Sequence, residues 1–194
     1  MRTTLKTLLL TAAALPLIGL GATGFAFDAQ AQTKTPGQME TGGLPPMKVT
    51  TSEYIQQAAM GDMFEIESSK LAAGKSANKD IKSFAERMVK DHSASTKKIN
   101  EASVKGKAGV TPPAELDGEH KAKLAVLRNA SGAEFDKQYV SAQIEAHEKA
   151  LRLHQGYAKN GDNKELKDAA DDIAEHVEDH LEKIKDIQKS MSKS

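Results

Sequence analysis

Six histidines occur in the chain, and three of them occupy positions that helical spacing assigns to a buried core. Each of the three belongs to an apolar stripe with heptad spacing: Ile81-Ala85-Met88-His92-Ser95-Ile99, Val140-Ile144-His147-Leu151 and Ile173-Val177-His180-Ile184-Ile187. A buried imidazole needs a partner for each ring nitrogen, either a hydrogen-bonding group or a metal ion. The pattern therefore predicts either a polar network or a metal site inside a helical protein.

A metal site would combine these three rings with a carboxylate from the segment that precedes them. Glu65, or alternatively Asp62, could supply the fourth ligand beside His92, His147 and His180. The chain contains no cysteine, so methionine is its only sulfur donor. A set of imidazoles and one carboxylate suits a single zinc, copper or iron ion.

The alternative is a hydrogen-bonded network that fixes helix register and binds no ion. Its candidate partners for the rings are Asp91, Ser95, Asp136 and Tyr139. The remaining histidines are weaker candidates. His176 lies four residues before His180, so one of this pair could be a ligand and the other its outer neighbour. We expect His120 and His154 at the surface or at a helix boundary.

Well-marked helices must position these residues. The predicted segments are 50–74, 78–104, 131–160 and 162–189, with a short helix over 117–128. Their capping signals are Thr50 with Glu53, Asn78, Ser131 with Glu134, and Asp162 with Glu165. Tight turns predict that the first and last helix pairs are antiparallel hairpins. No strand pattern is present. We therefore predict an all-α, four-helix bundle with a long connection that carries the short helix between the second and third long helices.

The long connection either crosses the length of the bundle or folds back at one end. If it crosses, the second and third helices are parallel, and His92 and His147 lie 14 residues beyond Asn78 and Ala133. The two rings then share one height. His180 would lie about 6 Å from that height along the axis, at about 1.5 Å per residue.

The first helix has two apolar faces, one marked by Ile55 and Ile66 and the other by Phe64 and Leu71. A helix of this kind packs against more than one neighbour. The short helix or a second copy of the chain could cover the spare face, so a homodimer through this helix is one hypothesis.

The N-terminus has the features of an export signal. Arg2 and Lys6 precede an apolar run from Leu8 to Leu20, and Ala29-Gln30-Ala31 fits a cleavage site. We predict a signal peptide over 1–31, a flexible Pro/Gly-rich linker over 32–49 and a bundle domain over 50–190, located in the periplasm. An uncleaved N-terminal anchor is the alternative; after cleavage we expect no transmembrane domain.

The charge balance gives no reason to expect nucleic acid as a partner. The chain has 27 basic and 27 acidic residues, and the two signs are interleaved. Neither a nucleophile elbow nor a phosphate-binding loop is present, so we expect no enzymatic activity.

Several motifs together resemble an exported bacterial family, domain of unknown function 4142. They are Gly61-Asp62-Met63-Phe64-Glu65-Ile66-Glu67, Phe84-Ala85-Glu86-Arg87-Met88-Val89-Lys90-Asp91-His92 and Gly132-Ala133-Glu134-Phe135-Asp136-Lys137-Gln138-Tyr139-Val140. The resemblance extends from Thr51 to Ile187. It implies a ferritin-like fold in an envelope protein, with Glu65, His92, His147 and His180 as characteristic polar core residues. It brings no established activity.

Di-iron ferritin-like proteins carry a Glu-x-x-His motif on each of two helices. Here the residues three before the core histidines are Val89, Ile144 and Val177, so di-iron chemistry is not expected. Two hypotheses remain. The first is a non-catalytic periplasmic bundle, connected with envelope stress, with structural histidines. The second is a periplasmic protein that binds one metal ion in the bundle core.

Overall fold

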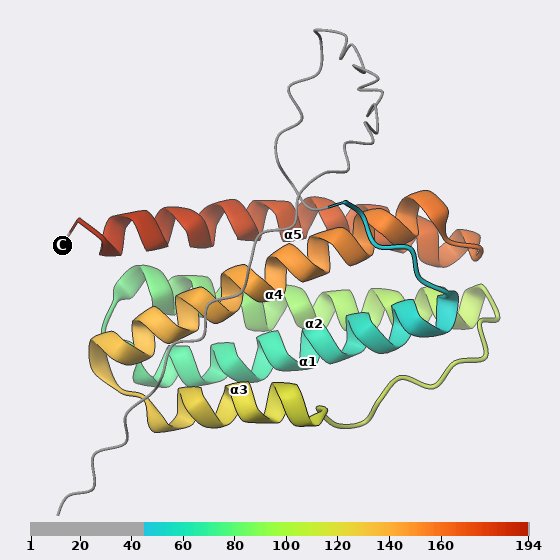
Figure 1. Ribbon diagram of the computed structural model, residues 1–194. Helices are drawn as coiled ribbons and strands as arrows, with labels where there is room; N and C mark the ends of the chain where they lie inside the picture. The colour runs from blue at the N-terminus through green and yellow to red at the C-terminus, as the bar shows by residue number, and fades with distance from the viewer. Residues whose placement is uncertain (1–44, 194) are drawn as a thin grey trace, which may run out of the picture. The chain divides into compact units, whose positions relative to one another are not determined.

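A computed structural model describes residues 45–193; the predicted signal peptide and linker residues 32–44 lie outside the described residues. The described part contains five α-helices: α1 (Thr51–Lys75), α2 (Lys79–Lys105), α3 (Gly118–Asn129), α4 (Gly132–Asn160) and α5 (Lys164–Met191) (Figure 1). No strand occurs in residues 45–193. The all-α prediction is confirmed.

The four long helices form a ferritin-like bundle of two antiparallel hairpins, α1–α2 and α4–α5 (Figure 1). The connection between the hairpins runs back along the bundle through α3, so α2 and α4 are parallel. Helix α1 packs against α2 and α4, and α5 packs against the same two helices. Of the two routes open from the sequence, the chain takes the crossover.

The helix starts follow the sequence signals at some ends and depart from them at others. Thr50 and Glu53 form the full capping box of α1. Ser131 precedes α4 but makes no side-chain capping bond, so the capping box predicted there does not form. Helix α5 is capped by Asn163, whose Oδ1 accepts the Leu166 N–H at 3.2 Å, and not by Asp162.

The second apolar face of α1 is covered by the connecting helix. Phe64 lies in one apolar cluster with Leu124 and Leu127 of α3, and all three are buried. The Asp117 N–H just before α3 donates to Met60 Sδ at 3.3 Å. The short helix therefore covers this face within the chain, and a homodimer through α1 stays a hypothesis.

The core consists of two apolar clusters with a polar layer between them along the helices. One cluster contains Met88, Val140 and Ile184. The other contains Ile99, Leu153, Ile173 and Val177. Each core histidine lies between members of the two clusters on its own helix: His92 on α2, His147 on α4 and His180 on α5.

Residues 45–49, assigned from the sequence to the linker, lie against α4. The Met47 N–H donates to the Arg152 carbonyl at 3.0 Å, and Met47 and Val49 pack against the second apolar cluster. Gly156 permits this approach, because a Cβ atom there would lie 1.8 Å from the Met47 carbonyl oxygen. The packed part of the chain thus begins before Thr50.

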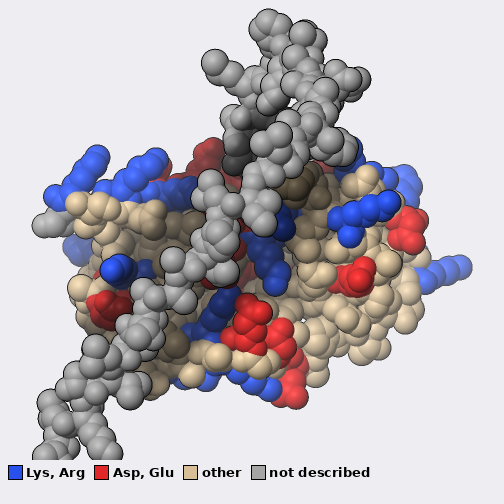
Figure 2. Space-filling view, viewed as in Figure 1, with Lys and Arg blue, Asp and Glu red and all other residues tan. Residues whose placement is uncertain are grey.

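The exposed surface carries charges of both signs. On the face seen in Figure 2, Lys and Arg side chains are interspersed with Asp and Glu side chains and with uncharged residues. Among the described helices, none combines the length and the apolar character that crossing a membrane requires.

Candidate metal centre

His92, His147 and His180 meet in the polar layer. Their rings are 2%, 0% and 1% exposed, and the three pairs of ring centroids are 5.5 or 5.6 Å apart. One ring nitrogen from each lies within 4.8 Å of one from each of the others. The parallel course of α2 and α4 brings His92 and His147 to one height, and α5 contributes His180. His176 is exposed one turn away, so the choice within this pair falls on His180.

One nitrogen of each ring is fixed by a hydrogen bond from outside the cluster. His92 Nδ1 donates to Asp62 Oδ1 at 2.8 Å, and His147 Nδ1 donates to the Gln143 carbonyl at 2.8 Å. His180 Nε2 donates to Asp91 Oδ2 at 3.0 Å. Each of these bonds sets the tautomer of its ring and directs the other nitrogen elsewhere.

The other nitrogen of each ring has no hydrogen-bond partner. These atoms are His92 Nε2, His147 Nε2 and His180 Nδ1, and all three are buried. A buried polar atom without a partner costs about 1–3 kcal/mol, and such atoms are uncommon in folded proteins. Three of them in one cluster of rings call for an explanation beyond helix register.

The predicted carboxylates lie on the hydrogen-bonded side of the rings. Glu65 Oε2 is 3.2 Å from His92 Nδ1, and Glu65 Oε1 is 3.1 Å from His147 Nδ1. Asp62 bonds His92 through Oδ1 and accepts the Thr96 hydroxyl at Oδ2, at 2.9 Å. Glu65 and Asp62 thus contact the Nδ1 atoms of the rings. They also form a separate cluster with His92 in which oxygens and a ring nitrogen lie within 4.8 Å.

Burial and the charges of neighbouring groups shift the pKa values of the site residues in different directions. Burial raises the pKa of Glu65 to about 7. Burial lowers the pKa of His92, but the neighbouring Glu65 and the hydrogen bond to Asp62 outweigh it and raise this pKa to about 9. Burial and the charge of His92 lower the pKa of His147 well below its usual value and that of His180 to about 4. The rings of His147 and His180 are therefore neutral and keep a free lone pair.

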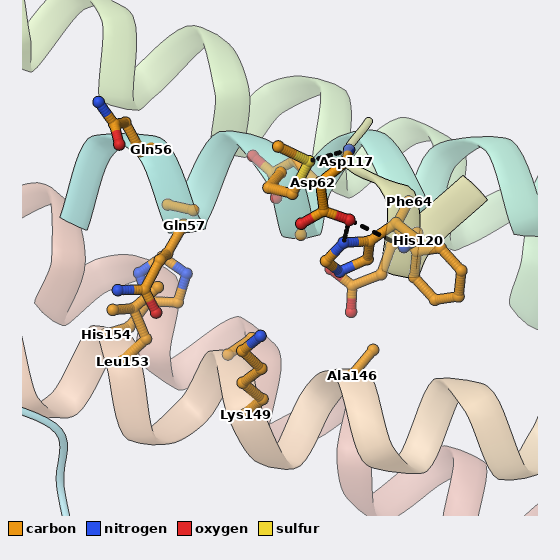
Figure 3. A pocket seen from close by; sticks show the side chains of 15 residues that line it. Gln56, Gln57, Asp62, Phe64, Asp117, His120, Ala146, Lys149, Leu153 and His154 are labelled. Carbon is orange, nitrogen blue, oxygen red and sulfur yellow. Dashed lines mark hydrogen bonds and ion pairs between the residues drawn. The ribbon is translucent and has the colours of Figure 1, made fainter. Parts of the chain in front are cut away.

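Two cavities reach the site from different sides. One, of about 300 Å³, lies between α2 and α5 and is lined by His92 and His180. The other, of about 240 Å³, is lined by Asp62 and Glu65 of α1, by residues of α4 and by the start of α3, and touches none of the three core rings. Figure 3 shows Asp62 of α1 across this second cavity from Lys149 and His154 of α4. The imidazole and carboxylate sides of the site thus border separate openings.

Of the four residues predicted to bond the core histidines in a polar network, one does so. Asp91 bonds a core histidine, as that hypothesis proposed, whereas the Tyr139 hydroxyl pairs with Ser69 at 2.9 Å. Ser95 Oγ and Asp136 Oδ1 are buried and have no hydrogen-bond partner. The Gln143 carbonyl was not foreseen, because no side-chain pattern marks a carbonyl that a ring one turn later will use.

His154 corrects the sequence prediction of a boundary position. It is 2% exposed, and its Nδ1 lies 3.1 Å from the Tyr54 hydroxyl. Burial lowers its pKa to about 4. The apolar residues around it belong to the cluster of Tyr54, Leu153 and Tyr157. The continued stripe His147-Leu151-His154 was the available signal for this burial.

Comparisons with known proteins agree with the fold. No curated protein matches the chain. A structure of CopM in the Cu(II)-bound form has a TM-score of 0.63 and 18% identity, covering 74% of this chain and 99% of CopM. A DUF305 fragment from Deinococcus radiodurans has a TM-score of 0.63 and 14% identity, covering 77% of this chain and all of the fragment (100%). The model of the domain of unknown function DUF4142 matches residues 36–187, and the chain belongs to the DUF4142 family.

Proposed function

We propose that the bundle core binds one divalent transition-metal ion through His92 Nε2, His147 Nε2 and His180 Nδ1. The observation that carries this proposal is the set of three buried ring nitrogens without hydrogen-bond partners in one cluster of rings. A bound ion would use the free lone pairs of His147 and His180. It would also displace the proton that a pKa of about 9 keeps on His92, so that His92 Nε2 becomes the third ligand. Binding would then remove the penalty of leaving these nitrogens unpaired. A purely structural network would leave them unused.

The surroundings of the rings support the same role. Histidines that bind metals commonly donate their second ring N–H to a carboxylate or a backbone carbonyl, which orients the ring and makes it more basic. Asp62, the Gln143 carbonyl and Asp91 accept these bonds here. Glu65 contacts two of the rings at the same side. We assign Glu65 and Asp62 to this supporting shell and propose that they do not bind the ion directly.

Copper(II) is the first ion to test. Three imidazole nitrogens suit zinc and copper, and copper(II) binds nitrogen ligands more tightly than zinc does in the general order of divalent metals. CopM, which shares the fold, was determined in a Cu(II)-bound form. The fold alone does not carry a metal preference, so zinc is the direct competitor in the experiment.

We further propose that the protein is exported to the periplasm and holds the ion without catalysing a reaction. The charged start and apolar run within residues 1–31 support export. The sequence lacks the paired Glu-x-x-His motifs of oxygen-activating di-iron bundles. The mass of the N-terminal peptide in a periplasmic extract tests export, and a chain that keeps residues 1–31 there would contradict cleavage.

The test of binding is metal content and thermal stability of the untagged protein, measured by elemental mass spectrometry and by melting with and without copper(II). We expect about one ion per chain in the wild type. At about 1,000 times the dissociation constant, the ion should stabilise the fold by about 4 kcal/mol. The His147→Leu and His180→Leu variants should lose both effects.

His176→Leu is the matched control, because it removes an exposed histidine on the same helix as His180. It should keep the ion and its stabilisation. Circular dichroism of each variant separates loss of binding from loss of folding. Copper content in folded His147→Leu that equals that of the wild type would rule out the proposed site.

A further inference from the structure

The cavity between α2 and α5 opens onto the proposed ion site. Both His92 and His180 line it, whereas His147 does not. The approach to the cluster from this side therefore passes between two of the three rings. A volume of about 300 Å³ leaves room for a small molecule beside the rings.

Three protein ligands leave at least one coordination position of a transition metal for another group. Closed structural zinc sites use four protein ligands, whereas sites with three keep a position for water or another small ligand. The carboxylates of α1 contact the Nδ1 atoms of His92 and His147 and border the other cavity. The open position thus belongs to the side of the α2–α5 cavity.

The charged side chains of this cavity are paired with one another or with a neighbour, so the positive charge that would attract an anion is that of the ion itself. Arg87 and Lys98 are the cationic lining residues; Arg87 is paired with Asp91, the one carboxylate of the lining, and Lys98 with Asp172 at 2.9 Å. Asp91 is already bonded to His180 and to Arg87, at 3.0 and 3.1 Å. The Asp91 carboxylate is therefore occupied by its own partners.

The Ser95 hydroxyl is a hydrogen-bond donor without an acceptor. Ser95 lines the cavity one turn after His92, is 8% exposed, and its hydroxyl has no hydrogen-bond partner. Its side chain lies on the core face of α2, in the same stripe as His92. A small anion between the ion and this hydroxyl would satisfy the last unpaired group of the cavity wall.

We propose that the α2–α5 cavity binds a small inorganic anion that completes the coordination of the ion, with Ser95 Oγ as its hydrogen-bond donor. This inference rests on the proposed metal site. The competing occupant of the open position is His176, which also lines the cavity.

The test uses azide as the probe anion and the full-length copper(II)-loaded protein. Azide should change the electron paramagnetic resonance spectrum and add a charge-transfer band, both saturably, while gel filtration shows that copper stays bound. Ser95→Ala should weaken azide binding about five-fold, the size expected for one lost hydrogen bond. Ser93→Ala is the matched control, since Ser93 is exposed on the same helix and bonds the Val89 carbonyl.

The outcomes separate the two proposals. Copper that is bound by the wild type and lost in His147→Leu, but is insensitive to azide, overturns the anion site and leaves the metal site standing. If the spectrum of His176→Ala differs from that of the wild type before azide is added, His176 is the fourth ligand. This result also overturns the anion site. Equal azide affinity in Ser95→Ala and Ser93→Ala refutes the role of Ser95. Failure of the wild type to bind copper or zinc removes both proposals.

Discussion

His154, the buried histidine outside the candidate metal centre, gives a prediction that depends only on the fold. His154 is 2% exposed, and burial lowers its pKa from 6.5 to about 4. Below pH 6.5 the unfolded chain binds a proton at this ring, whereas the folded chain stays neutral until about pH 4. Protons then favour the unfolded state, so His154 makes the free energy of unfolding fall as the pH is lowered through this window.

The magnitude follows from the width of the window. Each pH unit corresponds to about 1.4 kcal/mol, so this ring removes about 3 kcal/mol of stability between neutral pH and about pH 4.5. His154→Gln cannot take up this proton. We expect the variant to be less stable than the wild type at pH 7, because the bond with the Tyr54 hydroxyl and the packing are altered, and its deficit should shrink by about 3 kcal/mol at about pH 4.5.

The assay is urea denaturation of the metal-free protein at several pH values, with His176→Gln as a control that alters an exposed ring. Chelator in the buffer keeps metal linkage out of the comparison. A deficit of His154→Gln that stays constant from pH 7 to about pH 4.5 would refute the argument. The folded protein would then accept the proton at this ring as easily as the unfolded chain does.

Two further predictions concern the ends of the helices. Gly156→Ala places a Cβ atom 1.8 Å from the Met47 carbonyl oxygen, so it should displace residues 45–49, cost about 1–3 kcal/mol and speed hydrogen exchange at the Met47 amide. Gly74→Ala, where a Cβ atom meets nothing within 4 Å, should leave that amide protected and be neutral or stabilising; similar losses in the two variants would contradict the packing of Met47. Asn163→Ala removes both the cap of α5 and the 2.8 Å bond to the Gly106 carbonyl, and should cost about 1–2 kcal/mol in thermal or urea unfolding. Ser131→Ala should cost much less, because Ser131 makes no capping bond, and equal losses would show that the caps are assigned wrongly.

Much of the fold could be predicted from the sequence because apolar spacing and turn residues act locally. The crossover could not be derived in this way, because the length of the connection between the two hairpins also allowed it to fold back at one end. The capping details were harder. Ser131 and Asp162 both carry the capping pattern, but a cap also needs the right backbone direction, and Gly132 follows Ser131 with a left-handed φ of 56°.

The sequence predicted which histidines gather in the core, but not how their ring nitrogens are oriented. Heptad spacing identified His92, His147 and His180, because it reports which side of a helix faces the core. It does not report which ring nitrogen faces inward, since that depends on partners from other helices, such as Asp91 of α2 for His180 of α5. The prediction of Glu65 as a fourth ligand depends on the same information and stays a prediction. His154 was misplaced although the stripe His147-Leu151-His154 runs through it; the position near the helix end suggested solvent access, and the partner of the ring, Tyr54, comes from α1.

The three histidines come from both hairpins, and this has a consequence for the lifetime of the folded domain. An ion shared by them would act as a cross-link between positions 55 and 33 residues apart, from His92 to His147 and from His147 to His180. The chain has no cysteine with which to make a disulfide. By the chain-entropy relation, closing a loop of the longer length restricts the unfolded state by about 4 kcal/mol. The ion would then link the two hairpins reversibly. The resistance of the domain to proteases would rise and fall with the supply of the ion.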